Sequence, residues 1–136
     1  MSSALPVFIP SSSIEIVTEW ISKARGDLEV AQREHALGLG GSTDAVVFHC
    51  QQAIEKLLKG LIAQAGREPP KIHDLPELSR SVRAIHPAWN WPIEDLRFLT
   101  FGAVQSRYPG TIASLQDSND AFALSLRVWA ALALLY

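Results

Sequence analysis

The sequence contains a single cysteine, Cys50, among its 136 residues. One thiol cannot form an intrachain disulfide, and no second cysteine or histidine stands at the spacing of metal ligands from it. None of the four histidines pairs with a carboxylate or thiol at such a spacing either. These absences exclude a disulfide-stabilised scaffold, and we expect no metal, no cofactor and a reducing, cytoplasmic environment.

An excess of charge of either sign is also absent. The chain has 12 Lys and Arg residues against 14 Asp and Glu residues, which gives a formal net charge of −2. A protein that coats nucleic acid normally carries a basic excess, so RNA is not favoured as a partner. A local basic pocket remains compatible with this balance.

No hydrophobic run is long enough for a membrane span. Residues 121–136 are very apolar, but they include Ser125 and Arg127 and are fewer than the roughly 20 residues that a span needs. Residues 1–13 contain no Lys or Arg, and Pro6 and Pro10 interrupt their short apolar run. We therefore expect neither a signal peptide nor a membrane anchor.

The composition favours helices. Hydrophobic residues make up 48% of the chain and charged residues 19%, which excludes intrinsic disorder. Aromatic residues make up only 8%, whereas the chain has 17 Ala and 17 Leu, the two strongest apolar helix formers. The length suits one domain with a single core.

Apolar residues recur three and four positions apart in two long segments. The first follows Ser12 and Glu15, whose spacing is that of a capping box, and ends at Gly38. The second begins near Ser42 and ends at Gly66. Such spacing places side chains on one face of a helix that packs in a bundle. The positions on this face are Ile14, Val17, Ile21, Ala24, Leu28, Ala31 and His35 in the first helix, and Val47, Cys50, Ile54, Leu57 and Leu61 in the second.

Shorter helices are predicted after a loop that contains two adjacent prolines. A third helix begins at Asp74, which we expect to cap it, and a fourth begins near Pro92 and ends near Arg107. A final helix begins at Asp117 or Ser118. The residues predicted to face the core are Leu75, Leu78, Val82 and Ile85 in the third helix, and Ile93, Leu96, Leu99 and Ala103 in the fourth.

These elements predict an all-α fold, an antiparallel up-and-down bundle of four to five helices. Residues 13–136 form its single domain, and residues 1–12 form a flexible N-terminal tail. The final helix carries apolar side chains on every side, which predicts a second buried surface against a copy of the chain or a partner. Those side chains belong to Phe122, Leu124, Leu126, Val128, Trp129, Leu132, Leu134, Leu135 and Tyr136.

A polar strip runs along the second helix beside its apolar face. Gln52, Glu55, Lys56 and Lys59 lie three or four residues apart and therefore share one edge. One interpretation is a solvated face with a Glu55–Lys59 ion pair. The other is a strip that binds an anion, with Lys56 and Lys59 supplying the charge.

Arg107, Tyr108 and His73 are further candidates. One interpretation of Arg107 is a helix cap, because a cation at the C-terminal end of a helix interacts favourably with the helix dipole. The other is a phosphate-binding residue, because a guanidinium is the best planar partner for a phosphate. Tyr108 could stack on a base. His73 fits either a structural hydrogen bond to the loop or a place in the site.

The chain resembles the HEPN family, the higher eukaryotes and prokaryotes nucleotide-binding domain. The similarity covers about residues 15–135, and its most specific parts are the second-helix run from Gln51 to Lys59 and the later His-Asp-Leu. The residues that carry it are Trp20, Ala24, Asp27, Leu28, Ala31, Phe48, Gln51, Gln52, Ala53, Glu55, Lys56, Lys59, His73, Asp74, Leu75, Arg107, Tyr108 and Pro109. The resemblance implies a bundle of four or five helices, usually a homodimer, often paired with a minimal nucleotidyltransferase as toxin and antitoxin.

Many members of that family are metal-independent ribonucleases with an Arg, four to six residues, and then a His. No His follows Arg107 within that reach. Arg67–His73 and Arg80–His86 match the count, but the first spans the Pro-Pro loop and the second ends the third helix. We therefore expect no catalytic residues in this chain.

The leading hypothesis is a helical bundle that binds a nucleotide or phosphate and partners a nucleotidyltransferase. Its phosphate-facing cations are Lys56, Lys59 and Arg107. Tyr108 supplies a stacking surface, Gln52 and Glu55 orient the ligand, and His73 is a further candidate. The alternatives are a ribonuclease toxin and a dimerisation scaffold without a ligand.

Overall fold

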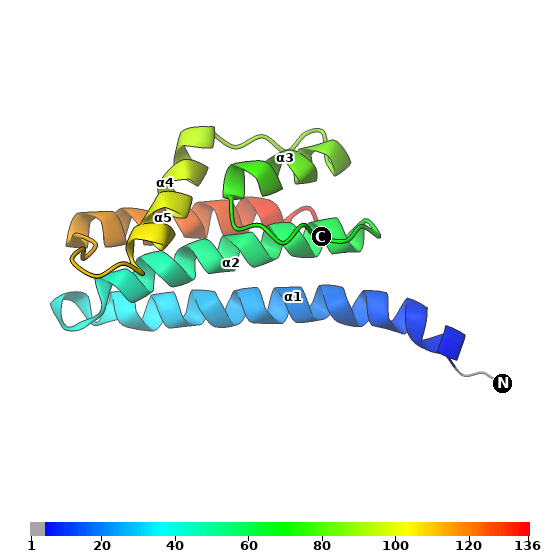
Figure 1. Ribbon diagram of the computed structural model, residues 1–136, viewed down its shortest axis with the longest axis horizontal. Coiled ribbons are helices and arrows are strands. Elements are labelled where there is room, and N and C mark those ends of the chain that lie inside the picture. Colours follow the sequence, from blue (N-terminus) through cyan, green and yellow to red (C-terminus); the bar gives the residue numbers. More distant parts are fainter. Residues whose placement is uncertain (1–4) are drawn as a thin grey trace.

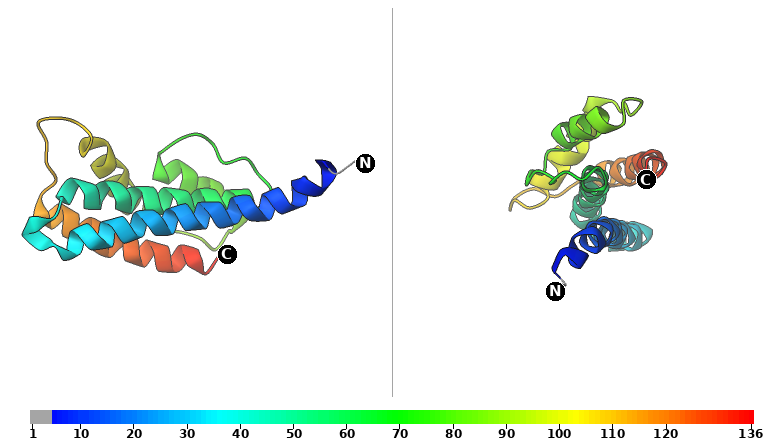
Figure 2. Two further views of the ribbon diagram at one scale, coloured as in Figure 1. Left: turned by 90° about the horizontal axis from the view of Figure 1, so that it is seen from below. Right: turned by 90° about the vertical axis from the view of Figure 1, so that its right-hand side faces the viewer.

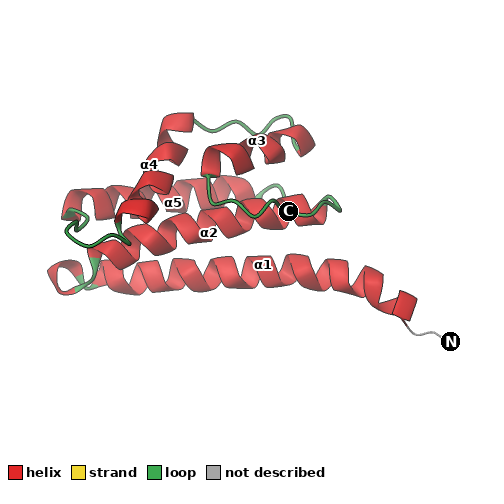
Figure 3. Cartoon of the chain, in the orientation of Figure 1, coloured by secondary structure: helices red, strands yellow, loops and turns green. Residues whose placement is uncertain are grey.

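The structure, a computed structural model, describes the backbone of residues 5–136 and the side chains of residues 14–136. The described part consists of five α-helices with one short 3-10 turn and no strand (Figure 3). The elements are α1 (Leu5–Ala36), η1 (Gly38–Gly40), α2 (Thr43–Gln64), α3 (Leu75–Ile85), α4 (Ile93–Gln105) and α5 (Leu115–Ala133). The prediction of an all-α helical bundle is confirmed. None of the described helices is long and apolar enough to cross a bilayer.

Helix α2 lies at the centre of the bundle and packs against all four other α-helices. Seen along the bundle, α1 lies on one side of α2, α3 and α4 lie on the opposite side, and α5 flanks it (Figure 2). The segments between α2 and α3 and between α3 and α4 lead the chain back toward the end where α2 begins, so α5 runs in the same direction as α2 (Figure 1). Polar side chains of α2 therefore lie near neighbouring elements on more than one side.

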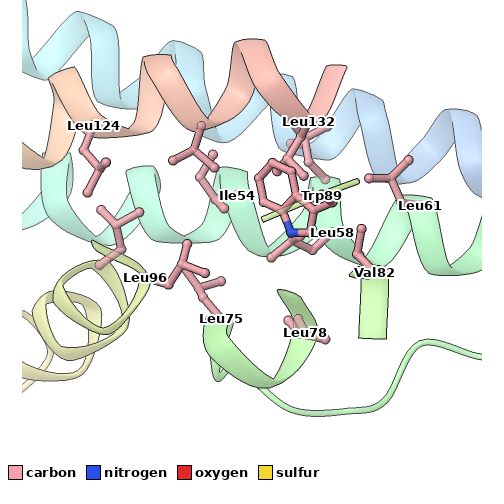
Figure 4. Packing of buried hydrophobic residues seen from close by; sticks show 14 of the residues in the cluster. Ile54, Leu58, Leu61, Leu75, Leu78, Val82, Trp89, Leu96, Leu124 and Leu132 are labelled. Carbon is pink, nitrogen blue, oxygen red and sulfur yellow. The ribbon is translucent and has the colours of Figure 1, made fainter. Parts of the chain in front are cut away.

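The core forms around α2 because its neighbours cover it on several sides. All five apolar positions predicted for the second helix are buried. Of the positions predicted for the third helix, Leu75, Leu78 and Val82 are buried as well. Trp89, in the connection between α3 and α4, is buried as well, and its indole N–H donates to Ser79 Oγ at 2.9 Å. Figure 4 shows the cluster, which includes Ile54, Leu58, Leu61, Leu75, Leu78, Val82, Trp89, Leu96, Leu124 and Leu132.

The first helix begins earlier than predicted. Helix α1 starts at Leu5, so the prediction of a helix start with a capping box at Ser12 is wrong. Pro6 lies in the first turn, where its missing N–H has no helical partner, and it therefore does not block the helix. Residues 1–4 of the predicted tail lie outside the described residues.

Two predicted core residues are exposed, Ile14 and Ile93. Trp20 of α1 lies against Gly60, and the antiparallel α2 ends four residues later at Gln64, so Ile14 lies beyond the end of its partner helix. Ile93 is the first residue of α4 and lies at the edge of the bundle.

The helix caps differ from prediction at two places. Asp74 precedes α3 as predicted, but its side chain makes no capping hydrogen bond. The Leu75 N–H instead donates to Thr100 Oγ1 of α4 at 3.1 Å. Helix α5 begins at Leu115, and Ser114 caps it by accepting from the Asp117 N–H at 3.0 Å.

Gly60 permits a close approach of three elements at one end of α2. The Tyr136 hydroxyl donates to the Leu57 carbonyl oxygen at 2.5 Å, beside Gly60. A Cβ at Gly60 would overlap that hydroxyl and lie 3.2 Å from Trp20 Cβ. The absent side chain thus allows α1 and the end of α5 to pack on the same turn of α2.

Candidate ligand-binding site

Three polar side chains of α2 are buried: Gln51 is 1% exposed, Glu55 3% and Lys59 6%. Burying a charge is costly unless the group is paired and hydrogen-bonded. Glu55 Oε2 meets Lys59 Nζ at 3.2 Å, one helical turn away, so the two charges compensate each other. The Lys59 ammonium also lies 5.9 Å from the centroid of the Trp20 ring.

Glu55 is the centre of a hydrogen-bonded network that fixes the loop before α3. Gln51 Nε2 donates to Glu55 Oε1 at 3.0 Å and to the His73 carbonyl oxygen at 3.1 Å. Gln52 Nε2 donates to Gln51 Oε1 at 2.8 Å and lies 3.3 Å from Glu55 Oε1. His73 Nδ1 lies 3.1 and 3.2 Å from the two Glu55 oxygens. We call these five residues, Gln51, Gln52, Glu55, Lys59 and His73, the cavity-side cluster.

A cavity of about 310 Å³ opens beside this cluster, between α2, the loop before α3, and α4. Its walls come from elements that are far apart in the sequence. They are Phe48, Gln51 and Gln52 of α2, His73 and Asp74 of the loop, Thr100, Ala103 and Val104 of α4, and Arg107 just after α4. The Thr100–Leu75 hydrogen bond joins α4 to the start of α3 beside it.

Arg107 supplies the positive charge in the cavity wall. Its guanidinium carbon lies 5.7 Å from the centroid of the Phe48 ring, within the range of a cation–π contact. No other Arg or Lys of the described residues lines this cavity. Three of the predicted site residues, Gln52, His73 and Arg107, therefore meet in one place.

Lys56 has a different environment from the rest of the predicted polar strip. Its ammonium pairs with Asp27 of α1, which also accepts a hydrogen bond from His49 Nδ1 at 2.7 Å. We call Asp27, His49 and Lys56 the α1-side cluster. It ties α1 to α2, and none of its residues lines the cavity that contains Arg107. Glu55 and Lys59 do form the ion pair that one interpretation of the strip expected, but both residues are buried, so the expectation of a solvated face is wrong for them.

The remaining candidates lie outside the cavity wall. Tyr108 is 60% exposed and follows Arg107 into the loop. Arg80 pairs with Glu77 on the surface of α3, and His86 ends that helix. Four wall residues were absent from the sequence-based site: Thr100, Asp74, Phe48 and Gln51. The last three belong to the residues that carry the family resemblance.

A second cavity, of about 220 Å³, lies between α2, α4 and the loop before α5. Its walls include Asp44 and Asp117 but no basic side chain from the described part of the chain. Asp44 Oδ1 accepts the Ala113 N–H at 2.8 Å and so holds the loop in place. The acidic rim disfavours an anion, and the cavity with Arg107 is the better candidate for one. Within residues 14–136, no group of three or more His, Cys, Asp or Glu side chains could hold a metal ion.

One family model matches most of the chain, and two solved structures share its fold. The HEPN domain family model matches residues 17–134. TT1696 from Thermus thermophilus has a similar structure with a TM-score of 0.72 and 21% identity, covering 88% of this chain and 98% of that one. ST0689, an archaeal HEPN homologue, has a TM-score of 0.59 and 24% identity, covering 85% of this chain and 93% of that one. At these identities the structural likeness concerns the fold alone. No curated protein matches the chain.

Proposed function

Because the chain belongs to the HEPN family, we propose that it binds a nucleotide or a related phosphate ligand in the cavity between α2 and α4. The observation that carries this proposal is the meeting of Arg107, His73 and Phe48 in one cavity wall. These side chains offer a cation for a phosphate, a hydrogen-bonding ring and an aromatic surface. The size of the cavity, about 310 Å³, is at the lower end of small-molecule sites and suits a mononucleotide.

Each wall residue has a distinct task in this proposal. The Arg107 guanidinium binds phosphate oxygens through paired N–H groups. Phe48 provides apolar surface for a base, and such stacking contributes about 1–3 kcal/mol per base. Glu55 has an indirect role, because its carboxylate orients the side chains of Gln51, Gln52 and His73. Lys56 and Lys59 are paired within the protein, so the proposed ligand-binding groups are Arg107 and His73 instead.

Titration calorimetry with AMP, ATP and inorganic phosphate tests the proposal. Arg107→Ala is expected to weaken binding at least tenfold, because one charged hydrogen-bonding partner is lost. Arg97→Ala is the matched control, since Arg97 is an exposed arginine of α4 outside the cavity wall. Absence of binding at millimolar ligand, or an equal loss in both variants, contradicts the proposal.

The proposed assembly is a homodimer that also pairs with a minimal nucleotidyltransferase as toxin and antitoxin. The family supports this assembly. Two exposed apolar residues also support it: Leu126 on the outer face of α5, which is 43% exposed, and Leu134 just after α5, which is 85% exposed. The other apolar residues of α5 mostly face the core, and Trp129 packs against it. Trp129→Glu is therefore expected to destabilise the fold rather than to split a dimer.

Light scattering tests the homodimer. The wild-type protein is expected to have a dimer mass, and the double variant Leu126→Glu with Leu134→Glu is expected to be a folded monomer. A monomeric wild-type protein at micromolar concentration contradicts the proposal. If a nucleotidyltransferase is encoded beside this protein, co-purification of the two proteins tests the second partner.

A metal-independent ribonuclease is the second candidate function. The observation that favours it is that Glu55 holds His73 Nδ1, which leaves Nε2 to take a proton from a ribose 2′-hydroxyl while Arg107 stabilises the phosphate. RNA cleavage in EDTA that is lost in His73→Ala and kept in His86→Ala would establish this activity. If the wild-type protein does not cleave RNA, the ribonuclease candidate is wrong and only the binding proposal remains.

A further inference from the structure

The two glutamines beside the cavity have a fixed hydrogen-bond polarity. An amide side chain ordinarily can turn by 180° and exchange its donor and acceptor ends. In this protein the surroundings decide the orientation, because the chain of hydrogen bonds begins at the buried Glu55 carboxylate.

The orientation of the Gln51 amide follows from its two neighbours. One end of its amide lies 3.0 Å from Glu55 Oε1 and 3.1 Å from the His73 carbonyl oxygen. A carboxylate and a carbonyl oxygen only accept hydrogen bonds, so this end must be the NH2 group. The acceptor end of Gln51, Oε1, must then face Gln52.

The orientation of the Gln52 amide follows from its neighbours in the same way. One end of its amide lies 2.8 Å from Gln51 Oε1 and 3.3 Å from Glu55 Oε1, which are again two acceptors. That end must therefore be NH2 as well. Gln52 Oε1 is left as an acceptor, and no side chain or backbone group within residues 14–136 donates to it. Gln52 is half-buried and forms part of the cavity wall.

His73 has the same polarity for the same reason. Its Nδ1 lies within 3.2 Å of both Glu55 oxygens, so Nδ1 carries the hydrogen. In the neutral imidazole Nε2 is then an acceptor. Asp74 adds a carboxylate to the wall, which leaves Arg107 as the charged donor. The cavity thus presents acceptors on one part of its wall and a cationic donor on another.

We propose that the cavity selects a nucleotide whose base carries an exocyclic amino group, such as adenine, and that Gln52 Oε1 accepts a hydrogen bond from this amine. The inference rests on the proposed nucleotide binding. Phe48 lies one turn before Gln52 on the same face of α2, so a base packed against Phe48 brings its edge to Gln52. A phosphate then binds Arg107.

The test compares AMP with purine riboside 5′-monophosphate, which lacks only the amino group. Titration calorimetry on the wild-type protein is expected to give at least tenfold tighter binding of AMP, because the analogue leaves the Gln52 acceptor unpaired. Gln52→Met keeps the length of the side chain but removes the acceptor, and is expected to bind the two nucleotides equally. Gln64→Met, at the exposed end of α2, is the matched control and keeps the preference.

The outcomes separate the two proposals. If the wild-type protein binds both nucleotides with equal affinity, or Gln52→Met keeps the preference for AMP, the selection by Gln52 is wrong while nucleotide binding stands. If neither nucleotide binds, both proposals are wrong. Far-UV circular dichroism of each variant verifies that the bundle remains folded.

Discussion

One stretch of α2 contributes to two polar clusters with different consequences. In the α1-side cluster, Asp27 is enclosed by two basic partners from α2, and none of the three residues lines the cavity that contains Arg107. In the cavity-side cluster, Glu55 gathers donors that themselves line a cavity. The first arrangement uses its hydrogen-bonding groups to join two helices. The second leaves acceptor atoms available to a ligand, and this difference separates a structural ion pair from a candidate site.

The largest expected effect comes from removing the centre of the cavity-side cluster. Glu55→Ala leaves the Lys59 ammonium buried without its carboxylate and is expected to destabilise the protein by about 3–5 kcal/mol. Urea unfolding followed by circular dichroism measures the change. A loss below about 1 kcal/mol would mean that Lys59 reaches water and that the cluster is not closed.

Raising the pH tests buried groups that lack a charged partner. Burial raises the pKa of the Cys50 thiol to about 11 from its ordinary 9.0, and burial also raises the pKa of Tyr136. The unfolded chain therefore loses these protons at a lower pH than the folded protein, so stability falls as the pH rises from about 9 to 11. The expected loss from Cys50 is about 2–3 kcal/mol, and Cys50→Ala removes this part of the pH dependence. A pH-independent free energy of unfolding over this interval would contradict the prediction.

Breaking the α1-side cluster has a smaller expected effect. Asp27→Ala removes the shared partner of His49 and Lys56, whose side chains are 28% and 22% exposed and can then turn toward water. We expect a loss of about 1 kcal/mol in the free energy of unfolding and unchanged affinity for AMP. A weaker affinity for AMP with intact helicity would show that the two clusters are coupled through α2.

The smallest expected effect on stability is that of Arg107→Ala. Arg107 is exposed and contacts only the Phe48 ring among the described aromatic residues, so the free energy of unfolding changes by about 0.5 kcal/mol or less. Ligand affinity falls at least tenfold in the same variant. A large loss of stability would assign Arg107 to the structure and not to the site.

The sequence was sufficient for the helices and for most of the core because both depend on periodicity. Cys50, Ile54 and Leu57 recur at helical spacing and are all buried. The start of α1 was wrong because a capping signature at Ser12 does not exclude a helix that begins before it. The exposure of Ile14 depends on where the partner helix ends, and the periodicity of apolar residues does not predict that position.

The site was only partly predictable, for a related reason. Spacing places Gln52, Lys56 and Lys59 along one edge of a helix, but it does not tell which neighbour covers each of them. Lys56 pairs with Asp27, 29 positions away, and Arg107 reaches the cavity only because α4 crosses α2. The polarity of Gln51 and Gln52 likewise depends on the His73 carbonyl, 22 positions from Gln51.

The central position of α2 also bears on the order of folding. Helices α1 and α2 are joined by residues 37–42, so their pairing closes a short loop and costs little chain entropy. The Tyr136–Leu57 hydrogen bond joins residues that are 79 positions apart and closes a much longer loop. We therefore expect an α1–α2 hairpin to nucleate folding and α5 to dock late. Changes at Tyr136 would then accelerate unfolding and leave the folding rate almost unchanged.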